Sequence, residues 1–333
     1  MTSFTRRRAA RTLASAIALS VPLCMTLQGN AHAQSDWPNK PVRIVASFAP
    51  GGSSDLVARQ LAAHLTTRYG QQFIVENRPG AGGNIGVTFV AKAPADGYTL
   101  GLATSGPLAN NKSLYKPMPF DAEKDLTPIA LVGEIPLVIA VNPAIKAGNL
   151  RELVALSKTG TNVLSFAHPG NGTIGHLGIE YMRINSGARL LAIPYKGDAP
   201  AMTDAISGST SGVSAPVTSL IPNVQAGKLR ALAVTSASRF PGLPNVPTAN
   251  EQGVKLEATV WSAMIGPAGL PKNIVTSLND EINKYTSSAE GKAKLASLGM
   301  NPLAGKPEQL SKLMATEAVK WKKVVESAKI SVE

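Results

Sequence analysis

The amino-acid sequence predicts an α/β fold divided into two lobes, each of them a sheet flanked by helices. Short apolar runs alternate with helical patterns almost to the end of the 333 residues, as expected when strands and helices pack in layers. Two such series of comparable size occur, one on each side of the apolar segments at residues 126–132 and 137–141. About 300 residues remain after the N-terminal segment, enough chain for two domains of ordinary size.

The first 33 residues have the three parts of a secretory signal peptide. Four arginines are followed by an apolar stretch at residues 13–27 and by the small-residue site Ala31-His32-Ala33. A membrane anchor is the other interpretation, but the stretch is shorter than the roughly 20 residues that a spanning helix needs. We therefore expect a periplasmic protein cleaved before Gln34. The general export route is favoured, because the residues after Arg7-Arg8 match the twin-arginine pattern poorly.

The composition of the mature chain excludes several classes of protein. Cys24 is the only cysteine, and Leu23 stands before it where a lipoprotein signal needs a small residue. Because Cys24 lies within the leader, the mature chain has no disulfide and no thiolate metal site. The formal charge of +12 falls to +8 without the four leader arginines, and the remaining basic residues are scattered. We therefore expect no nucleic-acid partner and a mild bias toward anionic ligands.

The first series of elements has the order βαβαβ. An apolar run at residues 42–48 is followed by a helix at 54–69, with Val57, Leu61 and Leu65 on one face and Gly70 as its stop. A strand at 73–76, a Gly-rich loop and helix at 79–93 and a strand at 98–103 complete the series. We expect parallel strands, because helices connect them.

The second series begins after two apolar segments, at residues 126–132 and 137–141, where the chain can pass between lobes. We expect helices at 149–158, 174–184 and 200–207, alternating with strands at 163–167, 190–194, near Gly212 and at 232–235. Residues 239–248 contain three prolines and predict an extended return to a strand at 256–265. Helices at 271–287, 289–298 and 307–330 follow, and Trp321 lies on the apolar, core-facing side of the last one.

Three glycine-containing loops are candidates for ligand contact: APGGSSD at residues 49–55, GAGGNIG at 80–86 and HPGNGTIGH at 168–176. Each is predicted at the carboxyl end of a strand and the start of a helix, where open α/β sheets bind ligands. The unpaired amide N–H groups of such a turn, together with the helix dipole, favour an anion. For any one loop, a tight turn with an ordinary helix cap explains the residues as well. The three loops together favour a binding site.

Enzymatic alternatives have less support. Gly170, Gly172 and Gly175 form a G-x-G-x-x-G pattern after a predicted strand, with Asp198 beyond the next strand. This is the context of a dinucleotide site, which would make the chain an exported oxidoreductase. The pattern is short, however, in a chain with 30 glycines. Neither a G-x-S-x-G nor an H-E-x-x-H motif occurs, so we expect no catalytic triad, no metal and no cofactor.

Taken in order, the motifs resemble one family over nearly the whole mature chain. The segments are WPNKPVRIVASFAPGGSSDLVAR, VENRPGAGGNIG, ADGYTL, HPGNGTIGHLGIE, IPYKGDAPA, GKLRALAVTSASR and NVPTANEQG. In order and spacing they resemble the Bug-type (TctC-like) extracytoplasmic solute receptors of tripartite tricarboxylate transporters. The resemblance implies a periplasmic binding protein of the Venus-flytrap, type II-like class, which closes on a small carboxylate without reacting with it.

The resemblance also implies how the lobes and the site are assembled. One lobe would comprise residues 34–133 and 237–333 and the other residues 134–236, joined by two crossings. Membrane permease subunits would be partners, and we expect a monomer. The ligand-binding residues carried over from the family are Pro50, Gly51, Gly52, Ser53, Ser54 and Asp55 on one side and Gly172, Thr173 and His176 on the other, with Asn84, Ser105, Lys196, Gly197 and Ala199 as further walls.

The predicted site contains no arginine, so we expect no bidentate clamp on a carboxylate. The grip would come from backbone amides and ordered water. Lys196 is either a cleft residue that attracts an acid or a solvated loop charge. Dicarboxylates, amino acids, nicotinate, aromatic acids and neutral amides are all compatible with these residues.

Overall fold

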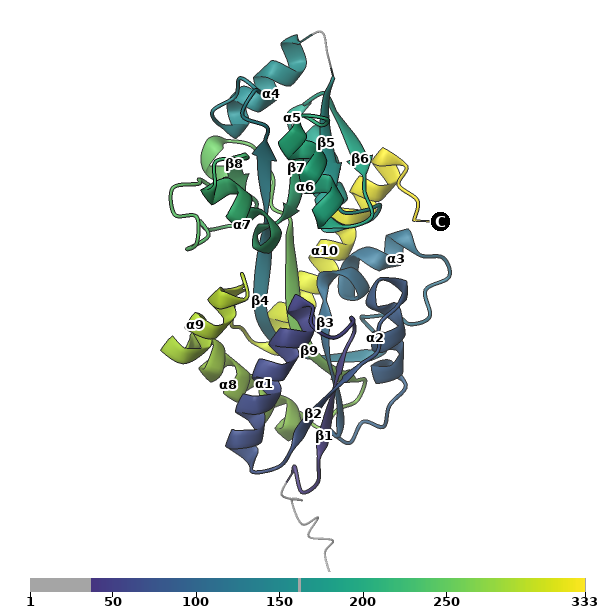
Figure 1. The fold of residues 1–333 in the computed structure, drawn as a ribbon. Coiled ribbons are helices and arrows are strands. Elements are labelled where there is room, and N and C mark those ends of the chain that lie inside the picture. The colour runs from purple at the N-terminus through teal and green to yellow at the C-terminus, as the bar shows by residue number, and fades with distance from the viewer. Residues whose placement is uncertain (1–36, 161–162, 333) are drawn as a thin grey trace, which may run out of the picture. The chain divides into compact units, whose positions relative to one another are not determined.

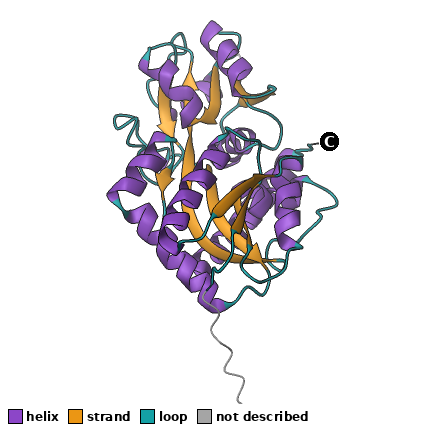
Figure 2. Cartoon of the chain, turned by 60° about the horizontal axis from the view of Figure 1, so that its bottom comes forward, coloured by secondary structure: helices purple, strands orange, loops and turns teal. Residues whose placement is uncertain are grey.

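The computed structural model describes residues 37–160 and 163–332. The expected signal peptide therefore lies outside the described residues. The compact unit that begins at Lys40 carries the helices and strands of the described chain, and it has two lobes (Figure 1). In both lobes the strands lie between helices (Figure 2), so the α/β prediction is confirmed.

The first lobe is built on a mixed sheet. Its strands are β1 (Val42–Ala46), β2 (Phe73–Asn77), β3 (Thr99–Thr104), β9 (Thr259–Pro267), the first part of β4 (Leu126–Val141) and the short β10 (Asn301–Pro302). The order is β2-β1-β3-β9-β4, with β10 on β4. Strands β1, β2 and β3 are parallel, as expected, whereas β9 runs antiparallel to β3 and to β4. The expectation of a parallel sheet is therefore wrong for β4 and β9, because no helical crossover connects each of them to its neighbour.

The second lobe repeats this arrangement. Its strands are β5 (Leu164–His168), β6 (Leu190–Pro194), β7 (Gly212–Pro216) and β8 (Arg230–Val234), together with the end of β4. Strand β5 pairs in parallel with β6 and β7, and β4 pairs antiparallel with β7 and β8. The carboxyl ends of β5 and β7 therefore lie at the same edge of the sheet, where the third glycine loop leaves β5.

Strand β4 joins the two sheets without interruption, although the sequence suggested two separate segments. Residues up to Pro136 pair with β9, and residues from Leu137 onward pair with β7. Proline has no amide N–H to donate, so Pro136 lies at the point where the strand changes partner. Buried Thr235 reinforces this junction, because its Oγ1 accepts from Leu137 N at 2.9 Å and lies 2.6 Å from the oxygen of Ala258.

The helices cover both sheets. In the first lobe these are α1 (Ser53–Tyr69), η1 (Ala81–Gly83), α2 (Asn84–Ala91), η2 (Gly106–Asn110), α3 (Asn111–Leu114), α8 (Lys272–Ser287) and α9 (Ala289–Ser297). In the second lobe they are α4 (Leu150–Thr159), α5 (Ile174–Ser186), α6 (Asp198–Ser207) and α7 (Val217–Gln225), with the single turn η3 (Asn250–Gln252) before β9. Helix α1 begins after Gly52 and ends at Gly70, whose φ of 69° is the left-handed conformation that closes many helices.

The C-terminal helix α10 (Pro307–Ala328) extends across both lobes (Figure 1). Leu310 and Met314 belong to the apolar core of the first lobe, and Trp321 and Val324 to that of the second. Trp321 is fully buried, as predicted, and its indole Nε1 donates to Glu317 at 2.7 Å. The expectation that this helix packs on a sheet is confirmed, because α10 contacts β4.

Two helical segments were not expected from the sequence. One is the continuous pair of η2 and α3 after β3, and the other is α7 after β7. The pattern of α7 is interrupted by Pro222, which removes an intrahelical hydrogen bond and usually ends a helix. Within residues 37–160 and 163–332, none of the helices is long and apolar enough to cross a membrane.

Candidate functional site

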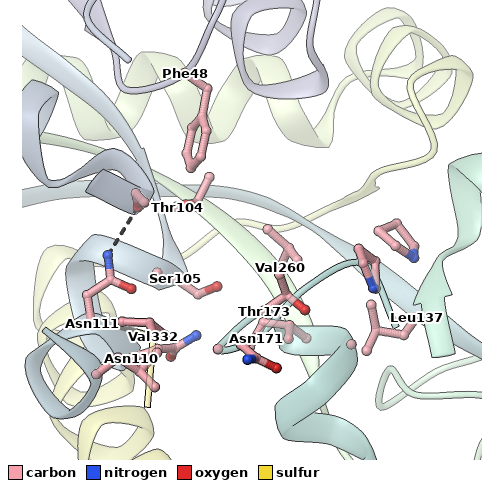
Figure 3. A pocket seen from close by; sticks show the side chains of 18 of the residues that line it. Phe48, Thr104, Ser105, Asn110, Asn111, Leu137, Asn171, Thr173, Val260 and Val332 are labelled. Atoms are coloured by element: carbon pink, nitrogen blue, oxygen red, sulfur yellow. Dashed lines mark hydrogen bonds between the residues drawn. The ribbon is translucent and has the colours of Figure 1, made fainter. Parts of the chain in front are cut away.

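A cavity of about 300 Å³ lies between the two lobes (Figure 3). The first lobe contributes the ends of β1 and β3 and the helices η2 and α3, and the second contributes the loop after β5 and the starts of α5 and α6. The residues that line it are Phe48, Gly82, Thr104, Ser105, Gly106, Asn110, Asn111, Leu114, Tyr115, Leu137, Pro169, Asn171, Gly172, Thr173, Ile174, Gly175, Asp198, Pro216, Val260 and Val332.

In the cavity wall, two buried polar side-chain atoms of the first lobe have no hydrogen-bond partner. Ser105 is 1% exposed and Asn110 is 2% exposed, and neither Ser105 Oγ nor Asn110 Oδ1 is bonded. In Figure 3, Ser105 directs its oxygen toward the space in front of Asn171 and Thr173. Because a buried polar atom without a partner is costly, these atoms are suited to a ligand or water that fills the cavity.

Asn111 ties the second glycine loop to this wall. Its Nδ2 donates to the oxygen of Gly82 at 3.1 Å and to Asn84 Oδ1 at 2.7 Å (Figure 3 shows the first contact). Gly82 has a φ of 62°, and a Cβ there would lie 2.8 Å from the Tyr115 hydroxyl. Asn84 is thus behind the cavity wall, where it holds Asn111 rather than lining the cavity itself.

The second lobe contributes the start of α5. Thr173 caps this helix by accepting from His176 N, and its hydroxyl donates to Gly170 O at 2.7 Å. Ile174 and Gly175 line the cavity, and as the first residues of the helix they have amide N–H groups without an acceptor inside the helix. These amides and the positive end of the helix dipole favour a negatively charged group in the cavity.

The glycines of this loop have packing roles. A Cβ on Gly175 would lie 2.6 Å from Ser214 O, and one on Gly172 would lie 2.6 Å from Val332 Cγ1. Glycine at these two positions therefore lets α5 approach β7 and lets the loop approach the C-terminal segment. Such close approaches explain two of the three glycines of the G-x-G-x-x-G pattern without a dinucleotide.

His168 and His176 form a stacked pair beneath the loop. Their ring centroids are 4.3 Å apart with an interplanar angle of 4°, and His176 Nδ1 accepts from Gly172 N at 3.2 Å. Burial lowers the pKa of His168 to about 4, with a further contribution from His176, and burial also lowers the pKa of His176. Both imidazoles are therefore neutral near pH 7 and hold the loop rather than bind an anion as cations.

Acidification should weaken the fold through His168. The folded-state pKa lies below the unfolded value of about 6.5, so stability is intact above pH 6.5 and falls as the pH drops toward about 4. The maximum loss is about 3 kcal/mol in the free energy of unfolding, measured by urea denaturation at pH 7, 6, 5 and 4. A His168→Gln variant should lose less stability over this interval, and equal losses would contradict the assignment.

The first glycine loop lies beside the cavity. Phe48, which precedes the loop, lines the cavity, whereas Pro50, Gly51 and Gly52 within it are exposed. Gly51 N donates to Asp55 Oδ2 at 2.9 Å, so this amide already has an acceptor. Gly52 has an ordinary backbone conformation, and a Cβ there would be 3.6 Å from its nearest neighbour, the oxygen of Ala49.

The Asp55 carboxylate holds this loop in place through hydrogen bonds. Besides Gly51, its carboxylate accepts from Arg59 Nε and Asn77 Nδ2, each at 2.9 Å. Burial raises the pKa of Asp55, but these hydrogen bonds outweigh the effect and hold the pKa below its usual value. The Ser54 hydroxyl is buried without a partner, and Ser53 borders a second cavity of about 810 Å³ that Asp198 also lines.

The loop before α6 places its residues differently. Lys196 and Ala199 are exposed, Gly197 is partly exposed with a φ of 107°, and these three residues do not line the first cavity. Asp198 does line it. Burial raises the pKa of Asp198, and hydrogen bonding from Ser219 opposes that shift.

Sequence reasoning therefore identified part of the cavity wall. Ser105, Gly172 and Thr173 line it, while Asn84 and His176 support lining residues. Asn110 and Asn111 were missed, although two adjacent asparagines shortly after a strand are a signal that could have identified them. Whether any of these residues contacts a ligand stays a prediction.

The charge of the cavity wall is unusual for an anion site. The lining contains no lysine, arginine or histidine, and its single ionisable acid is Asp198. Within the described ranges, no group of three His, Cys, Asp or Glu side chains is arranged to hold a metal ion. An anion here would be bound by amide and hydroxyl groups rather than by a counter-ion.

Comparison with known proteins gives a consistent result. The family model described as "Tripartite tricarboxylate transporter family receptor" matches residues 57–330. Protein BugT of Bordetella pertussis is 37% identical over 291 residues, covering 87% of this chain and 89% of BugT. A solved R. palustris protein with adipate is 34% identical with a TM-score of 0.74, covering 89% of this chain and 100% of that one. MatC from Rhodopseudomonas palustris with bound malate is 29% identical with a TM-score of 0.68, and the match covers 86% of this chain and 99% of MatC.

Proposed function

Since the chain belongs to the receptor family of tripartite tricarboxylate transporters, we propose that it captures a small carboxylate between its two lobes. The family assignment confirms the resemblance seen in the sequence. The relatives solved with adipate and with malate support a carboxylate ligand for this chain as well. The family consists of periplasmic solute-binding receptors rather than enzymes.

The single observation that carries the proposal is the pair of buried, unbonded polar atoms in the cavity between the lobes. Ser105 Oγ and Asn110 Oδ1 face the same space as the first amides of α5. The Ser105 hydroxyl and the main-chain N–H groups of Ile174 and Gly175 supply donors for one carboxylate, while Asn110 Oδ1 is an acceptor for a donor group of the ligand or for water. A micromolar complex requires about 8 kcal/mol, which such charge-assisted hydrogen bonds at 1.5–3 kcal/mol each can supply.

The predicted residues that do not line the first cavity would reach the ligand only when the lobes close. Ser53 and Asp198 border one shared cavity from opposite lobes, which supports a contribution of the loop at residues 50–55 when the lobes approach each other. We propose closure about the segments near Glu134 and Ser236, between a lobe of residues 34–133 and 237–333 and a lobe of residues 134–236.

Isothermal titration with a panel of small carboxylates tests the proposal. At least one acid should bind with micromolar or tighter affinity and raise the melting temperature. Failure of mono-, di- and tricarboxylates and amino acids alike would refute carboxylate capture.

Replacing Ser105 by alanine should weaken the tightest acid of the panel about 10- to 100-fold, because one hydrogen bond to a charged group is lost. The matched control is Ser311→Ala, which removes an exposed hydroxyl on α10 outside the first cavity. Titration calorimetry of both variants checks the prediction, and equal affinities would remove Ser105 from the site.

The dinucleotide alternative can be tested separately. Its support was the glycine pattern at Gly170, Gly172 and Gly175, and close packing accounts for the last two of these residues. We therefore expect no binding in a fluorescence titration with NADH. Saturable binding at micromolar NADH would instead support the alternative function, an exported oxidoreductase.

Export and partners are also part of the proposal. We propose that the leader is removed before Gln34, that the mature chain is a periplasmic monomer, and that its closed form is presented to membrane permease subunits. N-terminal sequencing of the exported protein tests the cleavage site. Light scattering with and without ligand tests the monomer, and co-purification with the permease subunits tests the partnership.

A further inference from the structure

The cavity proposed to bind a carboxylate contains a carboxylate of its own. Asp198 is the first residue of α6 and lines both the cavity of about 300 Å³ and the larger one beside Ser53. It is only partly exposed, and among the described residues no lysine, arginine or histidine makes an ion pair with it. Burial raises the pKa of Asp198, and hydrogen bonding from Ser219 on α7 opposes only part of this shift.

A partly buried acid without a counter-ion usually has a structural or a functional reason. The structural reason here is that a negative charge at a helix N-terminus interacts favourably with the helix dipole. This reason accounts for an acid in the first turn of α6, but it does not require that the residue line a ligand cavity. The functional reason is that a ligand supplies the missing positive charge.

The cavity wall has two regions of opposite electrostatic character. Ser105 and the first amides of α5 offer hydrogen-bond donors and partial positive charge to an anion. Asp198 offers the opposite charge from the start of α6. A ligand with two carboxylates would bring one of them into a small cavity that already contains an unpaired acid, whereas a zwitterion would match both regions.

We propose that Asp198 is a specificity-determining residue that selects a ligand with an ammonium group in addition to its carboxylate, so that the chain is a receptor for an amino acid. This inference rests on the proposed function, because it assumes that the carboxylate binds beside Ser105. The Asp198 carboxylate accepts hydrogen bonds from the ammonium group of the ligand and neutralises its charge.

The test uses pairs of ligands that have the same length and differ at one end. Straight-chain amino acids from β-alanine to 6-aminohexanoate, with α-amino acids such as alanine and leucine, are compared with the diacids from malonate to adipate. Each is titrated by calorimetry into the mature protein and into D198N, which retains the size of the side chain without its charge. D280N is the matched control, since Asp280 is an exposed acid on α8 that lines neither cavity.

The wild-type protein and D280N should bind the best amino acid at least tenfold more tightly than the diacid of equal length. In D198N this amino acid should bind at least tenfold more weakly, while diacids bind equally well or better. A wild-type preference for diacids, or an unchanged preference in D198N with an unchanged melting curve, would overturn the inference and leave carboxylate capture standing. If neither series binds but another carboxylate of the panel does, the inference fails and carboxylate capture stands. If no acid of the panel binds, the proposed function fails and the inference fails with it.

Should D198N melt well below the wild type, D198S serves as the second variant, because serine keeps a hydrogen-bonding side chain without the charge. It should show the same loss of preference for amino acids. A folded D198S protein with the wild-type preference would equally overturn the inference.

Discussion

Replacing Gly175 by alanine is expected to weaken ligand binding about 100-fold. A Cβ at this position would lie 2.6 Å from Ser214 O and 2.8 Å from Pro169 Cδ. A strand carbonyl and a proline ring cannot move aside as a flexible side chain can, so the first turn of α5 must shift. Displacement of a binding group by about 1 Å is enough for losses of this order. Overpacking should also lower the free energy of unfolding by about 1–3 kcal/mol.

Gly178, one turn further along α5, provides the matched control. A Cβ there would lie 3.4 Å from Leu137 Cδ1 and 3.5 Å from Ala258 Cβ, which are ordinary contacts. Gly178→Ala should therefore leave affinity unchanged and stabilise the helix by up to about 1 kcal/mol. Calorimetric titration and urea denaturation of both variants measure these effects. Similar affinities for the two variants would mean that the start of α5 is not part of the binding surface.

Replacing Trp321 by alanine should have the largest effect on stability, a loss of about 3–5 kcal/mol in the free energy of unfolding. The side chain is fully buried in the core of the second lobe, and its ring centroid lies 5.8 Å from that of Tyr181 in an edge-on arrangement. The change also leaves the buried Glu317 carboxylate without its indole donor. Urea denaturation followed by circular dichroism gives the loss.

Val319 is the control for this variant, because it lies on the same helix and is 57% exposed. Val319→Ala should change stability by no more than about 0.5 kcal/mol. A loss below about 1 kcal/mol for Trp321→Ala would show that α10 does not depend on this contact.

Most of the fold could be predicted from hydrophobic periodicity and from Gly and Pro. Strand β6 and the start of α5 were predicted at the observed residues, because apolar alternation and turn signals agree there. Periodicity does not report strand direction, so the antiparallel β4 and β9 were not foreseen. Periodicity also could not show that β4 continues through Pro136. Proline lacks an amide N–H, and the strand tolerates it here because its hydrogen-bonding partner changes from β9 to β7 at this residue.

The candidate site was less predictable, for a related reason. The glycine loops could be located from their sequence, but which of their amides are free depends on tertiary contacts. Gly51 N is bonded to Asp55, and Gly172 N is bonded to His176. Asn110 and Asn111 belong to a short helical segment with no clear periodicity, so their position in the wall emerges only from packing against the second glycine loop.

The continuity of β4 bears on how the chain folds. One strand provides hydrogen-bonding partners to both sheets, and one helix, α10, supplies apolar side chains to both cores. Either half separated from the other would lose a central strand or part of its hydrophobic interior. The protein should therefore unfold in one cooperative transition, and neither half should be recoverable as an autonomous fragment.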